Sequence, residues 1–106
     1  MYKIGSLEEM AMLLAAALGD DAYAVSIANE YTERTGNNIS IPAIHTVLKR
    51  LEEKGLLASR ESAPTQERGG RKKRIYSITQ MGYKVIHELR SQREDLWSLV
   101  PKMSIS

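Results

Sequence analysis

Cysteine is absent from this chain of 106 residues, which excludes a disulfide scaffold, a thiolate nucleophile and a cysteine-ligated metal. Phenylalanine is absent as well, and the aromatic side chains are five tyrosines and one tryptophan. The longest apolar run, which ends at Leu18, is far shorter than the ~20 residues that span a bilayer, and no basic leader precedes it. We therefore expect a cytoplasmic chain without a signal peptide or a membrane anchor.

Residue patterns that carry catalysis are equally scarce. His87 and Glu88 begin a zinc-protease motif, but Ser91 occupies the position of the second histidine, and the only other histidine is His45. No glycine-rich phosphate loop follows a predicted strand, and there is no Gly-x-Ser-x-Gly turn. The sequence thus predicts no enzyme, no cofactor and no metal site.

The charges that the sequence does have are distributed unevenly. Residues 1–35 hold six acids and two bases, whereas residues 36–106 hold thirteen bases and seven acids. Five bases fall within seven residues that also include two glycines and no acid: Arg68, Arg71, Lys72, Lys73 and Arg74. Such a run attracts a polyanion, and nucleic acid is the leading candidate. With 42% hydrophobic and 26% charged residues, the chain otherwise has the composition of one folded domain.

Two helices are expected in the first third of the chain. Ser6 and Glu9 have the spacing of a capping box, and the apolar residues that follow recur at helical spacing. This pattern predicts a helix over about residues 7–18. Either aspartate of residues 20–21 is expected to cap a second helix, which the Gly-Asn-Asn sequence at residues 36–38 ends.

A third helix and a hairpin follow. Ser40 is the predicted N-cap, Pro42 is tolerated in the first turn, and the helix is expected to run to about Lys54. Its inner stripe is Ile44, Val47, Leu48 and Leu51. Segments 57–62 and 74–78 have the composition and alternation of strands, and we expect them to pair around a basic, polar loop.

A long last helix completes the chain. Thr79 is its predicted N-cap, and Pro101 ends it. Three short helices, a two-stranded wing and a further helix predict a mainly helical α+β fold, a winged helix-turn-helix with a long C-terminal dimerisation helix. We assign residues 1–78 to the DNA-binding domain and residues 79–106 to the dimerisation helix and tail.

Two segments resemble a known family. His45 to Leu57 (HTVLKRLEEKGLL) and Gly69 to Gly82 (GGRKKRIYSITQMG) are similar to the third-helix and wing motifs of the PadR transcriptional regulators. The resemblance extends over about residues 4–89 and implies the short form of the family, which has one dimerising helix. The chain departs from the family at His45, where tyrosine is usual, and at Ala24, where glycine is usual.

In a winged helix of this kind the third helix enters the major groove and the wing contacts phosphates. The residues expected to contact DNA are Pro42, His45, Thr46, Lys49, Arg50, Arg71, Lys72, Lys73 and Arg74. The alternative is that these cations are only solvated, or that Arg50 pairs with Glu52 or Glu53 of its own helix. Tyr76 is expected in the core.

The last helix carries more apolar residues than a three-helix head can cover, so we expect it to pair with a second copy of the chain. Trp97 either anchors that interface or, as the resemblance implies for some short members, stacks a planar small molecule. The residues assigned to this ligand or dimer surface are Leu89, Arg93, Leu96, Trp97 and Val100.

The sequence therefore favours a dimeric repressor that binds double-stranded DNA sequence-specifically, with a small-molecule inducer and no membrane contact. A winged-helix protein-interaction module without DNA binding is the alternative, and a small-molecule-binding dimer with a vestigial DNA role is a third hypothesis. Steep salt dependence of duplex binding separates the first from the others.

Overall fold

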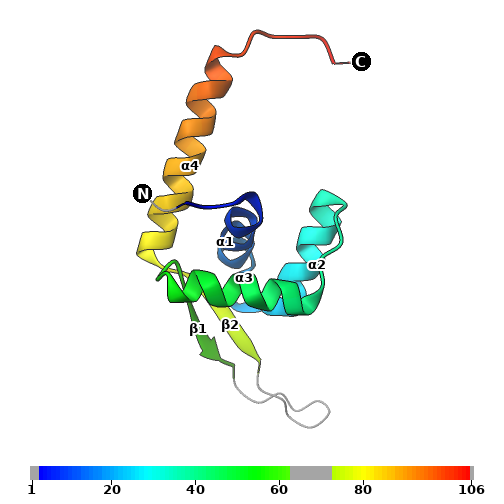
Figure 1. Ribbon diagram of the computed structural model, residues 1–106, viewed down its shortest axis with the longest axis vertical. Helices are drawn as coiled ribbons and strands as arrows, with labels where there is room; N and C mark the ends of the chain where they lie inside the picture. The colour runs from blue at the N-terminus through cyan, green and yellow to red at the C-terminus, as the bar shows by residue number, and fades with distance from the viewer. Residues whose placement is uncertain (1–2, 63–72, 106) are drawn as a thin grey trace.

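The computed structural model describes residues 3–62 and 73–105. Four α-helices, a 3-10 turn and a two-stranded antiparallel sheet make up this part of the chain, so the predicted mainly helical fold with a hairpin is confirmed (Figure 1). The elements are α1 (Ser6–Leu18), η1 (Gly19–Asp21), α2 (Ala24–Thr35), α3 (Ile41–Glu53), β1 (Leu57–Glu61), β2 (Arg74–Ile78) and α4 (Gln80–Leu99).

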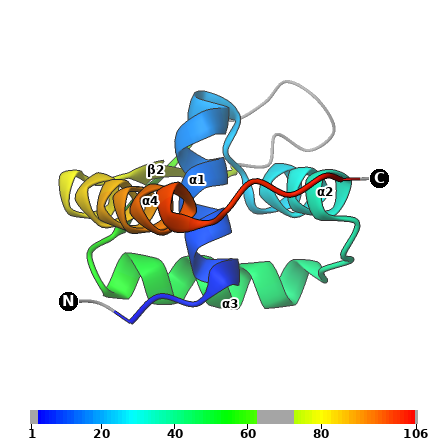
Figure 2. The same ribbon diagram turned by 90° about the horizontal axis from the view of Figure 1, so that it is seen from above.

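The first three helices form a head from which the wing and α4 extend in opposite directions (Figure 1). Seen from above, α1 runs between α4 and α2, and α3 lies across its N-terminal end (Figure 2). The largest fully buried side chains come from α1, α2, α3, the loop before β1 and the first residue of β1: Met12, Ile27, Ile44, Leu48, Leu51, Leu56 and Leu57. Burying these apolar side chains is the main driving force that holds the head together.

The start of α1 differs from the predicted capping box. The N-cap is Gly5 rather than Ser6, and the Gly5 backbone N–H donates to Glu8 Oε1 over 3.2 Å. The predicted pairing of Ser6 with Glu9 is therefore wrong by one residue. Glu8 is therefore the capping residue. Glu9, the next residue round the helix, faces the interior and has only 6% of its surface exposed.

The start of α2 also differs from the prediction. Neither aspartate of η1 caps the helix; the N-cap is Tyr23, whose backbone N–H donates to Ser26 Oγ over 2.9 Å. Both aspartates belong to the 3-10 turn, which directs Ala22 into the core. The predicted end of α2 is confirmed, because Gly36 adopts a left-handed conformation with φ of 75° and its N–H donates to the carbonyl of Thr32.

The wing is joined to the head at its root. In the antiparallel register Leu57 lies opposite Ile78, Ser59 opposite Tyr76 and Glu61 opposite Arg74. The backbone N–H of Tyr76 donates to the carbonyl of Ala22 over 2.9 Å, so the hairpin is also tied to the segment before α2. This backbone hydrogen bond, which adds to those between the two strands, fixes the direction in which the wing leaves the head.

The first turn of α4 packs tightly on the loop before β1. Thr79 caps the helix as predicted, since its Oγ1 accepts from the Gly82 N–H over 3.0 Å. The same hydroxyl donates to the carbonyl of Gly55 over 2.7 Å. A Cβ on Gly82 would lie 2.1 Å from the carbonyl oxygen of Leu56, so glycine is required for this close approach.

Candidate nucleic-acid interface

The outer face of α3 gathers the polar residues that the sequence singled out. Ser40 caps the helix, its Oγ accepting from the Ala43 N–H over 3.2 Å. Of the predicted inner stripe, Ile44, Leu48 and Leu51 are fully buried and Val47 is half-buried. The predicted contact residues of this helix are all exposed: Pro42, His45, Thr46, Lys49 and Arg50. The α3 periodicity thus presents one continuous outer arc, which crosses the front of the head in Figure 1.

Within this arc Thr46 has a local hydrogen bond. Its Oγ1 donates to the carbonyl of Pro42 over 3.1 Å, one helical turn earlier. The hydroxyl proton is therefore used within the helix, and the oxygen can still accept a hydrogen bond. A base amino group is the donor in the major groove that matches such an acceptor.

The C-terminal end of α3 is held by α1. Lys54 Nζ lies 2.9 Å from Glu8 Oε2. Burial raises the pKa of Glu8, but the hydrogen bonds from Lys54 and the Gly5 N–H and the charges of Lys54 and Arg50 outweigh it, so the pKa lies below its ordinary value. The carboxylate therefore stays ionised and anchors the end of α3 that carries Arg50.

The wing residues predicted to contact DNA fall partly outside the described residues. Arg71 and Lys72 lie there, whereas Lys73 and Arg74 are exposed at the start of β2. Lys73 Nζ lies 4.8 Å from the centroid of the Tyr23 ring, a cation–π contact with the turn before α2. Sequence periodicity could not find this contact, because Tyr23 and Lys73 are far apart along the chain.

A group of polar side chains connects the wing to α3. Ser59 Oγ donates to Glu52 Oε2 over 2.6 Å and accepts from Arg74 Nη1 over 3.2 Å. Arg74 Nη2 lies 3.9 Å from Glu61 Oε1. Arg74 thus has partners within the wing. Glu52, one of the two carboxylates named as alternative partners of Arg50, hydrogen-bonds the wing instead.

Arg60 is a wing cation that the sequence reasoning missed. It lies on β1, is 61% exposed, and its Nη2 is 3.1 Å from Asp20 Oδ1. The signal in the sequence was a basic residue within the predicted wing strand 57–62, which could have indicated a further cation on the wing. Asp20 was expected to cap α2 and is instead the partner of this arginine.

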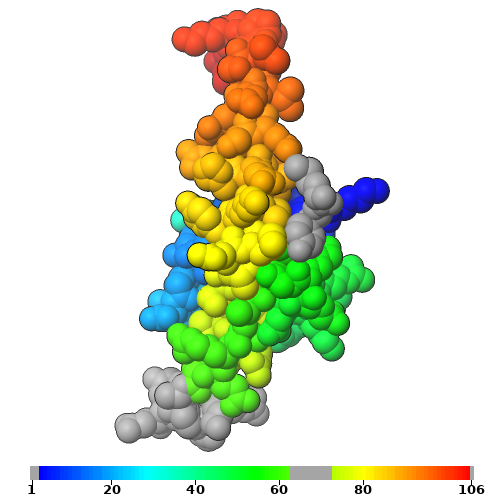
Figure 3. All heavy atoms as spheres, turned by 90° about the vertical axis from the view of Figure 1, so that its left-hand side faces the viewer, coloured from blue at the N-terminus to red at the C-terminus, as the bar shows by residue number. Residues whose placement is uncertain are grey.

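The C-terminal half of α4 stands clear of the head (Figure 3). Ile86 is buried and Leu89 half-buried, whereas Leu96, Trp97 and Val100 are exposed, Trp97 by 72%. A shallow hollow of about 170 Å³ is lined by Arg93, Leu96, Trp97 and Val100, four of the five residues assigned to the ligand or dimer surface. The structure therefore brings these four together on one side of α4.

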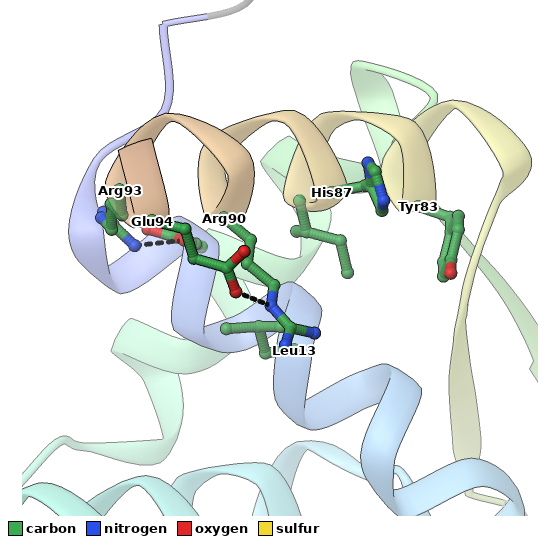
Figure 4. Close-up of a pocket in the computed structure, with 8 residues that line it drawn as sticks. Leu13, Tyr83, His87, Arg90, Arg93 and Glu94 are labelled. Carbon is green, nitrogen blue, oxygen red and sulfur yellow. Dashed lines mark hydrogen bonds and ion pairs between the residues drawn. The ribbon is translucent and has the colours of Figure 1, made fainter. Parts of the chain in front are cut away.

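A larger hollow of about 370 Å³ lies between α1 and α4 (Figure 4). Its lining residues are Glu9, Leu13, Tyr83, Ile86, His87, Arg90, Arg93 and Glu94. Two ion pairs border it: Arg93 Nη1 with the buried Glu9, at 2.5 Å, and Arg90 Nε with Glu94, at 2.8 Å. The first of these pairs ties α4 to α1, and no pattern in the sequence predicts it.

Three helices with an exposed third helix, followed by a hairpin that is fixed beside that helix, define a winged helix-turn-helix protein. Within the described ranges 3–62 and 73–105, no helix is long and apolar enough to cross a membrane.

The transcriptional regulator PadR-like family matches residues 13–91, and the chain belongs to this family. The expectation of a regulator rather than an enzyme is thereby confirmed. No curated protein matches the sequence significantly.

Solved structures show the same fold. A PadR-like transcription factor from Bacteroides fragilis is 25% identical with a TM-score of 0.72, and the match covers 88% of this chain and 84% of that one. A PadR family regulator from Clostridium difficile R20291 is 20% identical with a TM-score of 0.71, over 90% and 94% of the two chains. PadR of Bacillus subtilis, whose structure is a complex with operator DNA, is 17% identical with a TM-score of 0.65. That match covers 98% of this chain and 52% of the Bacillus protein.

Proposed function

We propose that the protein is a dimeric, cytoplasmic transcriptional repressor that binds operator DNA sequence-specifically. The single observation that carries the proposal is the outer arc of α3. Every contact residue predicted on this helix is exposed, whereas Ile44, Leu48 and Leu51 of its inner stripe are buried. His45 and Thr46 can hydrogen-bond base edges, and Lys49 and Arg50 can reach phosphates or a guanine edge. Bound there, the protein would occlude a promoter.

The wing is proposed to contact the phosphate backbone. Contact by at least two of the four residues Arg71, Lys72, Lys73 and Arg74 is expected, because this run carries positive charge without an acid. The position of the two strands supports this proposal. β1 and β2 leave the head beside α3, so the wing and this helix can contact the same duplex (Figure 1).

Residues 79–106 are proposed to dimerise two DNA-binding domains. Leu96, Trp97, Leu99 and Val100 are exposed on α4, and a stripe of this kind is an aggregation liability unless a partner covers it. A second copy is the partner that a helix-turn-helix protein requires to read two half-sites about one duplex turn apart.

A small-molecule inducer is the remaining element of the proposal. The hollow beside Trp97 offers an indole face to a planar compound, and a ligand that favours one angle between the two heads would change the half-site spacing. If Trp97 is only an interface anchor, Trp97→Ala weakens the dimer and leaves the ligand response unchanged. If it binds the inducer, the response is lost.

Fluorescence anisotropy of labelled duplexes tests DNA binding. The duplex carries the region upstream of the protein's own gene, a scrambled duplex is the control, and salt is varied from 50 to 200 mM. With about six phosphate contacts, affinity should fall roughly a thousandfold over this range. Absence of binding even at 50 mM salt would refute the proposal and favour the protein-interaction module.

A charge reversal tests the wing separately. Arg71, Lys72 and Lys73 are replaced together by glutamate, which should abolish binding, since three attractive charges become repulsive. Lys102→Glu is the control, because this residue follows α4 at the far end of the molecule from the wing (Figure 1). Intact affinity in the triple variant would refute the role of the wing.

A further inference from the structure

A hydrogen-bonded chain of three side chains joins α3 to both strands of the wing. Glu52 comes from the last turn of α3, Ser59 from the middle of β1 and Arg74 from the start of β2. Ser59 uses its single proton to donate to Glu52 and a lone pair to accept from Arg74, at 2.6 Å and 3.2 Å. Removing the hydroxyl would therefore break both connections at once.

The surroundings of this chain shield its inner half from solvent. Tyr76, opposite Ser59 in the register, is only 5% exposed, and both Glu52 and Ser59 are half-buried. The bond from Ser59 to the Glu52 carboxylate is short, at 2.6 Å, and bonds to a charged acceptor are stronger than neutral ones. The bond from Arg74, at 3.2 Å, is exposed and extends this contact to the second strand of the wing.

The position of the chain at the root of the wing amplifies its effect. Strands rise about 3.3 Å per residue, so the end of the described hairpin at Ser62 lies roughly 10 Å beyond Ser59. A rotation of about 10° at Ser59 would then move that end by roughly 2 Å, which is enough to break a directional hydrogen bond. Lys73 lies at this end of the hairpin, because the Ser62 N–H donates to the Lys73 carbonyl over 2.6 Å. The cations would still lie well within a Debye length (~10 Å) of the phosphates, so they would continue to neutralise them.

We propose that Glu52, Ser59 and Arg74 form a positioning network that sets the wing relative to α3 for DNA binding. Arg74 then acts through Ser59 rather than by neutralising a phosphate. The inference rests on the proposed function, since it concerns how the two DNA-contacting elements are held in register. It separates Arg74 from the other cations of the basic run, with which the sequence grouped it.

The salt dependence of DNA binding distinguishes a positioning residue from a phosphate contact. Each phosphate contact contributes about 0.9 to the slope of log affinity against log salt, so loss of a contact lowers the slope, whereas loss of alignment lowers affinity. The variants are Ser59→Ala, Arg74→Lys and the two combined. Ser77→Ala is the matched control, because Ser77 is an exposed serine on β2 that lies opposite Ala58 in the register.

We expect Ser59→Ala and Arg74→Lys each to bind the duplex about 5- to 10-fold more weakly than the wild type, the effect of losing one ordinary, partly exposed hydrogen bond. The double variant should lose no more DNA affinity than either single variant, because both changes break the same hydrogen-bonded network. The salt slope should stay at the wild-type value, and Ser77→Ala should bind like the wild type.

Three results would overturn the inference while leaving the proposed function intact. The first is a Ser59→Ala protein that binds DNA as tightly as the wild type. The second is an Arg74→Lys protein with wild-type affinity, since the lysine charge would then suffice for a phosphate contact. The third is a double variant whose loss of binding free energy equals the sum of the two single losses. If Ser59→Ala fails to fold, Arg74→Lys, which changes a half-exposed side chain, gives the answer alone. A wild-type protein that binds no duplex would overturn the proposed function and this inference together.

Discussion

Gly82→Ala should destabilise the protein although it replaces glycine in a helix. In an open helix the change is favourable by about 1 kcal/mol, because alanine has the higher helix propensity. Here the added Cβ would lie 2.1 Å from the Leu56 carbonyl oxygen and 2.8 Å from Ile78 Cδ1. The contact with Leu56 involves backbone, so the first turn of α4 would have to move by about 1 Å.

Such a movement has a cost that can be worked from the structure. Overpacking costs about 1–3 kcal/mol. Displacing the turn also weakens the Thr79 cap and the hydrogen bond from the Thr79 N–H to the Leu56 carbonyl at 3.2 Å, together worth about 1–2 kcal/mol. Set against the gain in propensity, the net loss is about 2 kcal/mol, which lowers Tm by roughly 10 °C in a domain of this size.

Thermal unfolding followed by circular dichroism measures this loss. All variants are compared at one fixed protein concentration, since the Tm of any protein that associates depends on concentration. Gln80→Ala, an exposed change in the same helical turn, is the control and should leave Tm nearly unchanged. A Gly82→Ala protein that is as stable as the wild type would refute the reasoning, because helix propensity would then outweigh the contact with Leu56.

Two ion pairs of α1 lead to further predictions. Because the pKa of Glu8 is lowered in the folded state, its carboxylate stabilises the fold above about pH 4.5, and this effect is lost as the pH falls through the folded-state pKa. The urea concentration at the unfolding midpoint should therefore be lower for Glu8→Gln than for the wild type at pH 7, and the two midpoints should converge in acid. Parallel curves would contradict this. Arg93→Met leaves the buried Glu9 carboxylate without its guanidinium and should cost about 1–3 kcal/mol in urea unfolding, whereas Arg90→Met, which breaks an exposed pair, should cost little. Equal losses in both variants would show that burial of Glu9 does not matter.

The site residues divide according to how far apart their partners lie in the sequence. The exposed arc of α3 could be predicted, because the helical period, the Ser40 cap and the buried stripe are local properties. The internal partners of the wing cations could not: Arg60 pairs with a residue 40 positions away, and Arg74 with one 15 positions away. Whether a cation is solvated, paired or free for a phosphate depends on which surfaces the fold brings together.

The beginning of α1 illustrates the limit of local reasoning. Ser6 with Glu9 and Gly5 with Glu8 have the same spacing, and the cap preferences favour serine only modestly over glycine. Tertiary structure decides between them, because Glu9 is buried against Arg93, 84 positions away. A shift of one residue rotates every side chain of the helix by about 100°, so the core selects the frame that buries Met12.

By itself the sequence determined the order of the elements, the wing between two strands, the outer face of α3 and the length of the last helix. Each of these follows from periodicity, turn residues and charge, which act over a few neighbouring positions. Only the tertiary structure decided which carboxylate caps α1, where the wing cations find partners, and why Gly82 must lack a side chain. Those features depend on contacts between elements that are distant along the chain, and close packing sets them.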